Sequence, residues 1–306
     1  MSRLVTRSDF DGLVCAMMLK ELGKIGEIKF VHPKDVQDGK VELFSDDITT
    51  NLPFDPRVGL AFDHHESEID RLKAVETDGK LIIDPKARST ARVVYDYYGG
   101  KETFPRISEE LMEAVDKGDS ADFSADEILN PAGWTLLHFI MDARTGLGRF
   151  HDFRISNYDL MMELIDACLI HRIDEILELP DVKERVDLYF DQEKLFKEQL
   201  KRIVRVEGKV AVIDLRNEEV IYAGNRFMVY AMYPETEISV HVAWGFRKQN
   251  TAVMIGKSII NKVSGVDIGA LCLKYGGGGH ANAGTCQLEN ETVDAQLPDI
   301  IAALNA

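Results

Sequence analysis

The first hundred residues alternate between short apolar runs and stretches of helical periodicity, and this alternation is what most constrains the fold. The predicted strands are the apolar runs at residues 4–6, 28–31, 41–44, 58–62 and 81–83. The predicted helices cover residues 13–22 and 89–98. Alternating strands and helices favour an α/β domain with a doubly wound parallel sheet. Ligands of such sheets bind outside the carboxyl ends of the strands, so we expect functional residues there.

The remainder of the chain predicts two further parts. From about residue 126 to 205 strand patterns vanish, and long helical periodicity with many charges covers residues 158–179 and 182–204. The later apolar runs, which predict a smaller, mixed second sheet, lie at residues 210–215, 220–223, 238–244 and 252–255. We therefore expect three parts, with boundaries at 1–130, 131–205 for a helical connector, and 206–306 for a smaller α/β domain.

Charge and composition narrow the classes of partner. The formal net charge of −16 disfavours binding to long duplex nucleic acid but leaves a short anionic substrate open. No apolar stretch has the length of a membrane span, and the N-terminus lacks the pattern of a signal peptide. The four cysteines form no C-x-x-C pair, which fits reduced thiols. We expect a cytoplasmic protein that binds neither duplex nucleic acid nor membranes.

Potential metal ligands follow several of the predicted strands. Asp63, His64 and His65 come directly after the apolar run at residues 58–62. Asp9 and Asp11 follow the first strand and open the first helix, where a pair of helix-capping aspartates is an equally good explanation of them alone. Further acidic pairs also have ordinary explanations, as turns or polar loops. These are Asp46 with Asp47, and Asp116 with Asp119.

Taken together, these clusters predict a metal centre. The carboxyl ends of parallel strands meet at one edge of a sheet, so the aspartates and the histidine pair would converge there. Oxygen and imidazole ligands suit Mn²⁺, or another divalent ion such as Mg²⁺ or Co²⁺, better than Ca²⁺ or a thiolate-bound zinc. One or two such ions could activate water and neutralise the transition state of a phosphoryl transfer.

A run of four glycines, residues 276–279, forms the second strong motif. Glycine backbone can approach a ligand closely and direct N–H groups at an anion, and His280 directly after the run could contact a phosphate. A flexible linker is the competing interpretation. The run lies between a predicted helix at residues 268–274 and an apolar segment at 286–288, which favours an ordered, ligand-facing loop.

These motifs resemble those of the DHH phosphoesterase superfamily, in the subfamily with a C-terminal DHH-associated domain. That subfamily includes RecJ-type exonucleases, oligoribonuclease/pAp phosphatases and cyclic dinucleotide phosphodiesterases. The resemblance rests on residues 9–12, 46–47, 63–65 and 276–284, and the helical connector carries no motif. It implies a DHH catalytic domain over residues 1–130, a DHH-associated substrate-binding domain over 206–306, and an active site in the interdomain cleft.

The resemblance also implies roles for particular residues. The implied ligands of a two-metal site are Asp9, Asp11, Asp47, His64 and Asp119, with Asp46 in place of Asp47 or Asp116 in place of Asp119 as second choices. His65 would bind the substrate phosphate. The residues implied to hold the far end of the substrate are Lys257, Ser258, Gly277, Gly278, Gly279 and His280.

Arg7 is a departure from the family pattern. The family has a metal-binding histidine two residues before the first aspartate, and a guanidinium cannot take its place as a ligand. Three outcomes stay open: a weakened first metal site, a single-metal enzyme, or an Arg7 that replaces the charge of that metal and grips phosphate. His32 is a further candidate ligand. Lys257 also stands where the family has arginine, and lysine lacks the bidentate fork.

The leading functional hypothesis is a Mn²⁺-dependent phosphohydrolase that acts on a small phosphate ester, a nucleotide or a short single-stranded oligonucleotide of the pAp or dinucleotide type. In this reading His65 and Arg7 assist the reaction. An exopolyphosphatase-like hydrolase of phosphoanhydrides is the second hypothesis. The third is a nucleotide-binding protein with a degenerate metal site, which Arg7 favours. The oligomeric state stays open, with a homodimer among the options.

Overall fold

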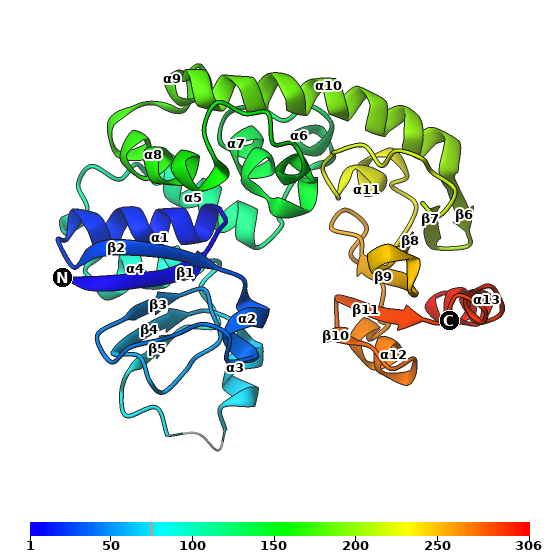
Figure 1. Ribbon diagram of the computed structural model, residues 1–306, viewed down its shortest axis with the longest axis horizontal. Coiled ribbons are helices and arrows are strands. Elements are labelled where there is room, and N and C mark those ends of the chain that lie inside the picture. The colour runs from blue at the N-terminus through cyan, green and yellow to red at the C-terminus, as the bar shows by residue number, and fades with distance from the viewer. Residues whose placement is uncertain (74–75) are drawn as a thin grey trace. The chain divides into compact units, whose positions relative to one another are not determined.

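The computed structural model describes all residues of the chain except 74 and 75. The chain divides into two compact units (Figure 1). The first comprises residues 1–122 and 132–187, and the second comprises residues 123–131 and 188–306. The four cysteines are buried and form no disulfide, as the sequence predicts. Among the described residues, no helix is long and apolar enough to cross a membrane.

The first unit contains a five-stranded sheet. Its strands are β1 (Ser2–Arg7), β2 (Ile25–Val31), β3 (Ile48–Thr50), β4 (Leu60–Asp63) and β5 (Leu81–Ile83). Every pair is parallel, and the order is β2-β1-β3-β4-β5. This confirms the predicted doubly wound parallel sheet. The strand order reverses between β1 and β3, which is where ligands bind in open sheets of this kind.

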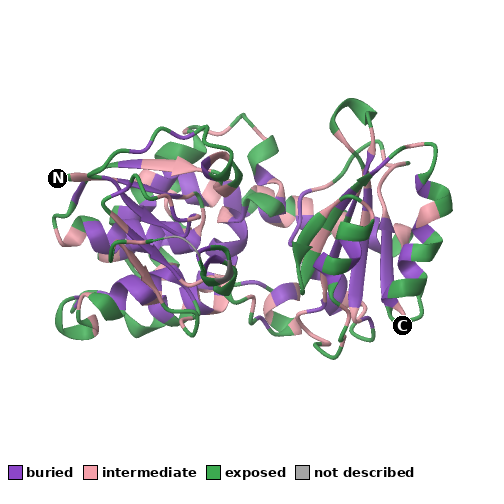
Figure 2. Cartoon of the chain, turned by 90° about the horizontal axis from the view of Figure 1, so that it is seen from below, coloured by how far each residue is buried: buried purple, intermediate pink, exposed green. Residues whose placement is uncertain are grey.

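Helices cover both faces of this sheet. On one side lies α1 (Phe10–Glu21), which is buried along nearly its whole length because residues 13–19 are all apolar. It packs against α4 (Thr90–Tyr97), α5 (Glu109–Asp119) and α8 (Asn157–Ile170). Residues of α2 (Pro33–Gln37) and of the loops join Val5 and Ala61 in an apolar cluster. Figure 2 shows buried residues on strands and on helices of each unit.

The middle of the chain is helical, as the sequence predicts. Its further helices are α6 (Ala125–Leu129), α7 (Gly133–Met141), α9 (Ile173–Leu177) and α10 (Pro180–Ile203). Residues 126–203 are all described and contain no strand. Single turns of 3₁₀ helix occur at Ala143–Thr145 and Leu147–Arg149. One further helix of the first unit, α3 (Glu66–Arg71), follows the histidine pair.

The second unit contains a mixed sheet, as predicted. Its strands are β6 (Val204–Glu207), β7 (Val210–Asp214), β8 (Ile238–Trp244), β9 (Thr251–Lys257), β10 (Gly278–His280) and β11 (Ala283–Leu288). The order is β10-β11-β9-β8-β7-β6, with β7 and β8 parallel and the other pairs antiparallel. Its helices are α11 (Met228–Met232), α12 (Ile268–Lys274) and α13 (Val293–Leu304). Apolar residues of α12 and α13 form one core with β7, β8, β9 and β11.

Two predicted strands do not form. In residues 220–223, Val220 and Ile221 are exposed and pair with no strand. In residues 41–44, Val41 and Leu43 are buried as parts of a loop that packs on the sheet. The third strand of the sheet, β3, begins instead at Ile48. It therefore follows the acidic pair Asp46 and Asp47, whereas the predicted strand preceded that pair. This shift changes which residue stands at the carboxyl end of β3.

Candidate metal centre

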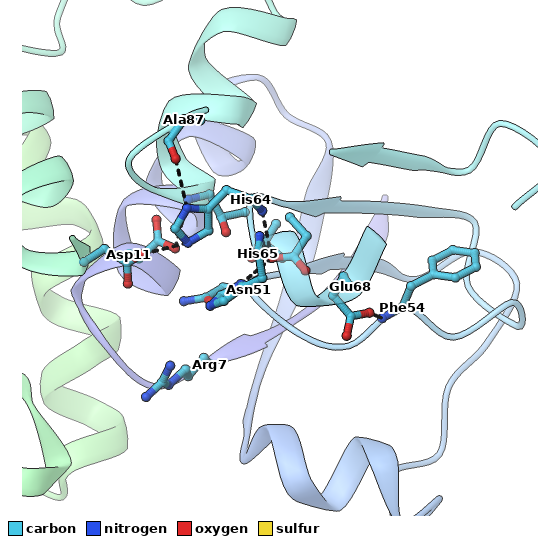
Figure 3. Close-up of polar contacts among 12 residues, drawn as sticks. Arg7, Asp11, Asn51, Phe54, His64, His65, Glu68 and Ala87 are labelled. Carbon is cyan, nitrogen blue, oxygen red and sulfur yellow. Dashed lines mark hydrogen bonds and ion pairs between the residues drawn. The ribbon is translucent and has the colours of Figure 1, made fainter. Parts of the chain in front are cut away.

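Three side chains of the first unit converge at the carboxyl edge of its sheet. They are Asp11 at the start of α1, His64 after β4, and Asp119 at the end of α5. One ligand atom of each lies within 4.8 Å of those of the other two. Figure 3 shows Asp11 and His64 pointing toward each other. Two carboxylates and one imidazole form a donor set that suits a divalent first-row ion.

Asp11 is fixed by the start of a second helix. Its carboxylate accepts the N–H groups of Thr90 (3.1 Å) and Ala91 (2.7 Å), which open α4. The side chain is almost fully buried, and burial raises the pKa of its carboxyl well above the usual range. The neighbouring carboxylates of Asp119 and Asp9 raise that pKa further. Negative charge is therefore concentrated here, and a bound cation would relieve it.

His64 is oriented as a metal ligand would be. Its Nδ1 lies 3.1 Å from the carbonyl oxygen of Ala87, to which the protonated nitrogen donates (Figure 3). Its Nε2 faces Asp119 Oδ2 at 2.7 Å. This buried Nε2 has no partner with hydrogen-bond geometry among the described residues. A histidine anchored through one nitrogen, with the other directed at carboxylates, fits a divalent ion.

The charges of His64 and Asp119 depend on each other in the absence of an ion. Burial favours the neutral ring, but Asp119 and Asp11 outweigh it and raise the pKa of His64 to about 9. Against the effect of burial, His64 lowers the pKa of Asp119. Without a metal the pair therefore holds a proton on the histidine, which a divalent ion would displace.

Asp63 orders the turn that carries both histidines. Its Oδ1 accepts the N–H of His64 at 2.8 Å and lies 2.7 Å from Nδ1 of His65. Asp63 itself is buried, whereas the His65 side chain is 43% exposed. The sequence-predicted pair thus separates into an inner histidine beside carboxylates and an outer one that can meet a substrate.

Asp9 lies next to the group and is surrounded by donors. Its Oδ1 accepts the N–H of Gly12 at 2.9 Å, which caps α1. Its Oδ2 lies 2.9 Å from Nε of Arg7. The amide nitrogen of Asn51 lies 3.4 Å from both oxygens. Burial raises the pKa of Asp9, and Arg7 opposes that rise.

Asn51 was not predicted as a site residue. It directly follows β3 and has a positive φ of 55°, a conformation that asparagine tolerates better than most residues. The signal for it was present, because the β-branched run from Ile48 to Thr50 favours a strand and asparagine favours the turn after it.

Asp47 lies at the opposite, amino end of β3. Its buried carboxylate accepts hydrogen bonds from Arg3 Nε (3.0 Å) and Nη2 (2.7 Å), and from the N–H of Phe44 (2.8 Å). Asp46 is exposed in the preceding turn. The structure therefore brings neither residue to the Asp11 group. The resemblance implied Asp47 as a metal ligand, with Asp46 as second choice, whereas the structure pairs Asp47 with Arg3.

Asp116 and His32 have structural partners of their own. Asp116 accepts hydrogen bonds from Ser89 Oγ at 2.7 Å and from Arg92 Nη2 at 2.7 Å. His32 is exposed and its Nδ1 accepts the N–H of Lys34, which caps α2. Of the two aspartates of α5, the structure therefore places Asp119, and not Asp116, beside Asp11 and His64.

Arg144 is a further residue that the sequence did not indicate. It lies in the 3₁₀ turn at Ala143–Thr145, and its Nε donates to Asp142 Oδ1 at 2.8 Å. Burial lowers its pKa, but Asp142, and after it Asp9 and Asp119, produce a net rise. Arg144 therefore adds positive charge in the electrostatic neighbourhood of the acidic group.

The second half of the glycine run, Gly278 and Gly279, belongs to an edge strand, and Gly276 and Gly277 lie in the connection that precedes it. Residues Gly278–His280 are β10, which pairs with β11. A Cβ on Gly277 would lie 2.1 Å from the carbonyl oxygen of Thr285, and one on Gly279 would lie 2.3 Å from that of Ala283. These two glycines are therefore required by packing. A Cβ on Gly278 would meet nothing within 4 Å, and His280 is exposed.

Lys257 and Ser258 lie at the end of β9. Lys257 is half-buried and is the last residue of the strand. The Ser258 hydroxyl accepts the N–H groups of Ile260 (3.2 Å) and Asn261 (3.0 Å), so it stabilises its own turn.

The chain is similar along its full length to a solved structure of high identity. No family model matches the chain, and no curated protein matches it. The structure of a pGpG-specific phosphodiesterase, PggH from Vibrio cholerae, is 55% identical with a TM-score of 0.89, over 100% of this chain and 99% of that one. A DHH domain from a member of a family of ribosomal proteins is 13% identical with a TM-score of 0.51, over 99% of this chain and 85% of that one. CDC45 from Entamoeba histolytica is 7% identical with a TM-score of 0.54, over 100% and 95%. The last two likenesses show the fold alone.

Proposed function

Because this chain belongs to the DHH phosphoesterase superfamily, we propose that it is a metal-dependent phosphodiesterase that hydrolyses pGpG. The observation that carries the proposal is the 55% identity to a pGpG-specific phosphodiesterase along the whole chain. The group of Asp11, His64 and Asp119 supports it, because phosphodiester hydrolysis at neutral pH commonly uses a divalent ion held by such ligands.

The proposed reaction consumes one water per dinucleotide. pGpG has a single 3′→5′ phosphodiester bond and a terminal 5′-phosphate. The oxygen of water forms a bond to the bridging phosphorus, the bond from phosphorus to the 3′ oxygen breaks, and that oxygen takes up a proton. The products are two molecules of 5′-GMP.

The side chains would divide the work by position. A divalent ion held by Asp11, His64 and Asp119 supplies Lewis-acid catalysis when bound. Asp63 fixes His65 through Nδ1, which would leave Nε2 of the ring for a phosphate oxygen. Mn²⁺ is the proposed ion because the donor set combines carboxylate oxygen with imidazole nitrogen.

A substrate panel tests the proposal. Chelator-treated protein is supplied with Mn²⁺, Mg²⁺ or Co²⁺ and assayed on pGpG, other dinucleotides, pAp and polyphosphate. We expect GMP from pGpG with Mn²⁺, and no turnover by Asp11→Ala. Release of no nucleotide from any substrate with any ion would refute the proposal, and turnover of polyphosphate alone would favour a phosphoanhydride hydrolase. The predicted substrate contacts Lys257 and His280 are tested by alanine variants, with a rise in KM for pGpG as the expected result.

A further inference from the structure

We propose that Arg7 and Asn51 close the position beside Asp9 to a metal ion, so that the centre holds a single divalent ion and Arg7 supplies the second positive charge. The ion count stands on the geometry alone, whereas the role of Arg7 toward phosphate rests on the proposed function.

The surroundings of Asp9 are those of a carboxylate that receives hydrogen bonds. Both oxygens are within reach of nitrogen donors: the backbone N–H of Gly12, the guanidinium of Arg7 and the amide of Asn51. A guanidinium has no lone pair to offer and stays protonated. A second ion at this position would need the lone pairs of Asp9 that these donors occupy, and would lie against the positive charge of Arg7.

Asn51 reinforces this arrangement. The amide nitrogen and not the amide oxygen must face a carboxylate, because only the nitrogen can donate. The left-handed backbone at Asn51 holds the side chain beside Asp9 at the switch point between β1 and β3. Figure 3 shows Asn51 and Arg7 on the same side of the centre as each other. The buried Oδ1 of Asn51 has no partner among the described residues, which leaves it as an acceptor for water or a substrate N–H.

The Asp11 group offers a cation three ligand atoms within 4.8 Å of one another and has no arginine paired with it in the described part of the chain, although both oxygens of Asp11 also accept backbone N–H groups. Its potential ligand atoms are the carboxylate oxygens of Asp11 and Asp119 and the buried Nε2 of His64, which faces Asp119 Oδ2 at 2.7 Å. The charges also balance with a single ion. The carboxylates of Asp9, Asp11 and Asp119 carry three negative charges, which one divalent cation and one guanidinium neutralise.

The side chain of Arg7 is 33% exposed, so the terminal nitrogens of its fork can reach a substrate while Nε stays on Asp9. A planar guanidinium binds two oxygens of a phosphate at once. In hydrolysis of pGpG it would stabilise the charge that develops on the bridging phosphate, which is the task of a second ion in two-metal enzymes.

Equilibrium binding of Mn²⁺ to chelator-treated protein, followed by calorimetry and by the electron paramagnetic resonance of free Mn²⁺, tests the ion count. We expect one ion per chain in the wild type and two in the double variant Arg7→His/Asn51→Asp, which replaces both donors with ligands. The matched control is Arg57→His, an exposed arginine paired with Asp55, where the count should stay at one. Two ions or none in the wild type, or a folded double variant that still binds one, would overturn the inference. Circular dichroism establishes folding, and the wild-type count does not depend on any variant.

Kinetics on pGpG test the role of Arg7 separately. We expect Arg7→Met to bind one Mn²⁺ with unchanged affinity and to lose about 10²–10³-fold in kcat, the usual cost of removing one donor to a developing anion. Arg7→Lys should recover part of the loss, since it keeps the charge without the fork. An unchanged kcat for Arg7→Met would overturn the role of Arg7. A wild type that binds one ion but leaves pGpG intact would refute the proposed function and leave the ion count standing.

Discussion

Oδ1 of Asp63 lies 2.7 Å from Nδ1 of His65, and the same oxygen accepts the backbone N–H of His64. One buried carboxylate therefore sets the orientation of both histidines. We expect Asp63→Asn to reduce kcat/KM for pGpG about 10–100-fold, the range seen when partners of site histidines are removed. If Asp63 acts through His65, the double variant Asp63→Asn/His65→Ala should be no worse than His65→Ala alone. Additive losses in this cycle would contradict that coupling.

Metal affinity should rise with pH. His64 can ligate only when Nε2 is unprotonated, and in the metal-free protein Asp119 and Asp11, against the effect of burial, raise its pKa to about 9. Below that pH an incoming ion must displace the proton, so the apparent affinity for Mn²⁺ should increase about tenfold per pH unit between about pH 7 and pH 9 and then level off. Anaerobic Mn²⁺ titrations across this range measure the slope. A flat profile would show that His64 does not give up a proton on binding.

Asp47 should be important for stability and dispensable for metal binding. It is buried and carries the bidentate hydrogen bonds of Arg3 at the amino end of β3. We expect Asp47→Ala to lower the free energy of unfolding by about 3 kcal/mol, because it leaves a partly buried guanidinium without its carboxylate partner. Urea denaturation measures this loss, and Arg3→Met provides the second arm of the cycle. Loss of Mn²⁺ binding in a folded Asp47→Ala protein would instead return Asp47 to the metal centre.

Neighbouring glycines in the second unit should respond differently to the same substitution. Gly277→Ala would place a Cβ 2.1 Å from the carbonyl oxygen of Thr285, whereas Gly278→Ala meets open space. We expect Gly277→Ala to lower the free energy of unfolding by more than about 2 kcal/mol and Gly278→Ala to change it by less than about 0.5 kcal/mol. Thermal or urea unfolding of the two variants decides this. Equal losses would mean that the glycine run is constrained by something other than packing against β11.

The sequence predicted the sheet and the helical middle because these depend on local patterns, and the resemblance to the DHH superfamily selected Asp11, His64 and Asp119 from the acidic and histidine clusters. Asp11, His64 and Asp119 each follow a strand or end a helix whose periodicity is clear. The error at β3 arose because two apolar runs flank the acidic pair. Val41 to Phe44 is as apolar as a strand, and only tertiary packing places it in a loop while Ile48 pairs with Leu4.

Other features of the site depend on contacts between distant residues. The carbonyl of Ala87 that sets the orientation of His64 is 23 residues away, and the N–H of Ala91 that Asp11 accepts is 80 residues away. Arg144 adds its charge from a 3₁₀ turn for which the sequence has no motif. Such pairings require the packed structure, since no local periodicity encodes them.

The donors around Asp9 also bear on how this centre could change during evolution. Asparagine and aspartate codons differ by a single base, and so do some arginine codons and those of histidine. Arg7 and Asn51 therefore stand a few base substitutions from a pair of metal ligands, on a backbone that already accepts them. Dependence on a second metal could be gained or lost in such a lineage without any change of fold.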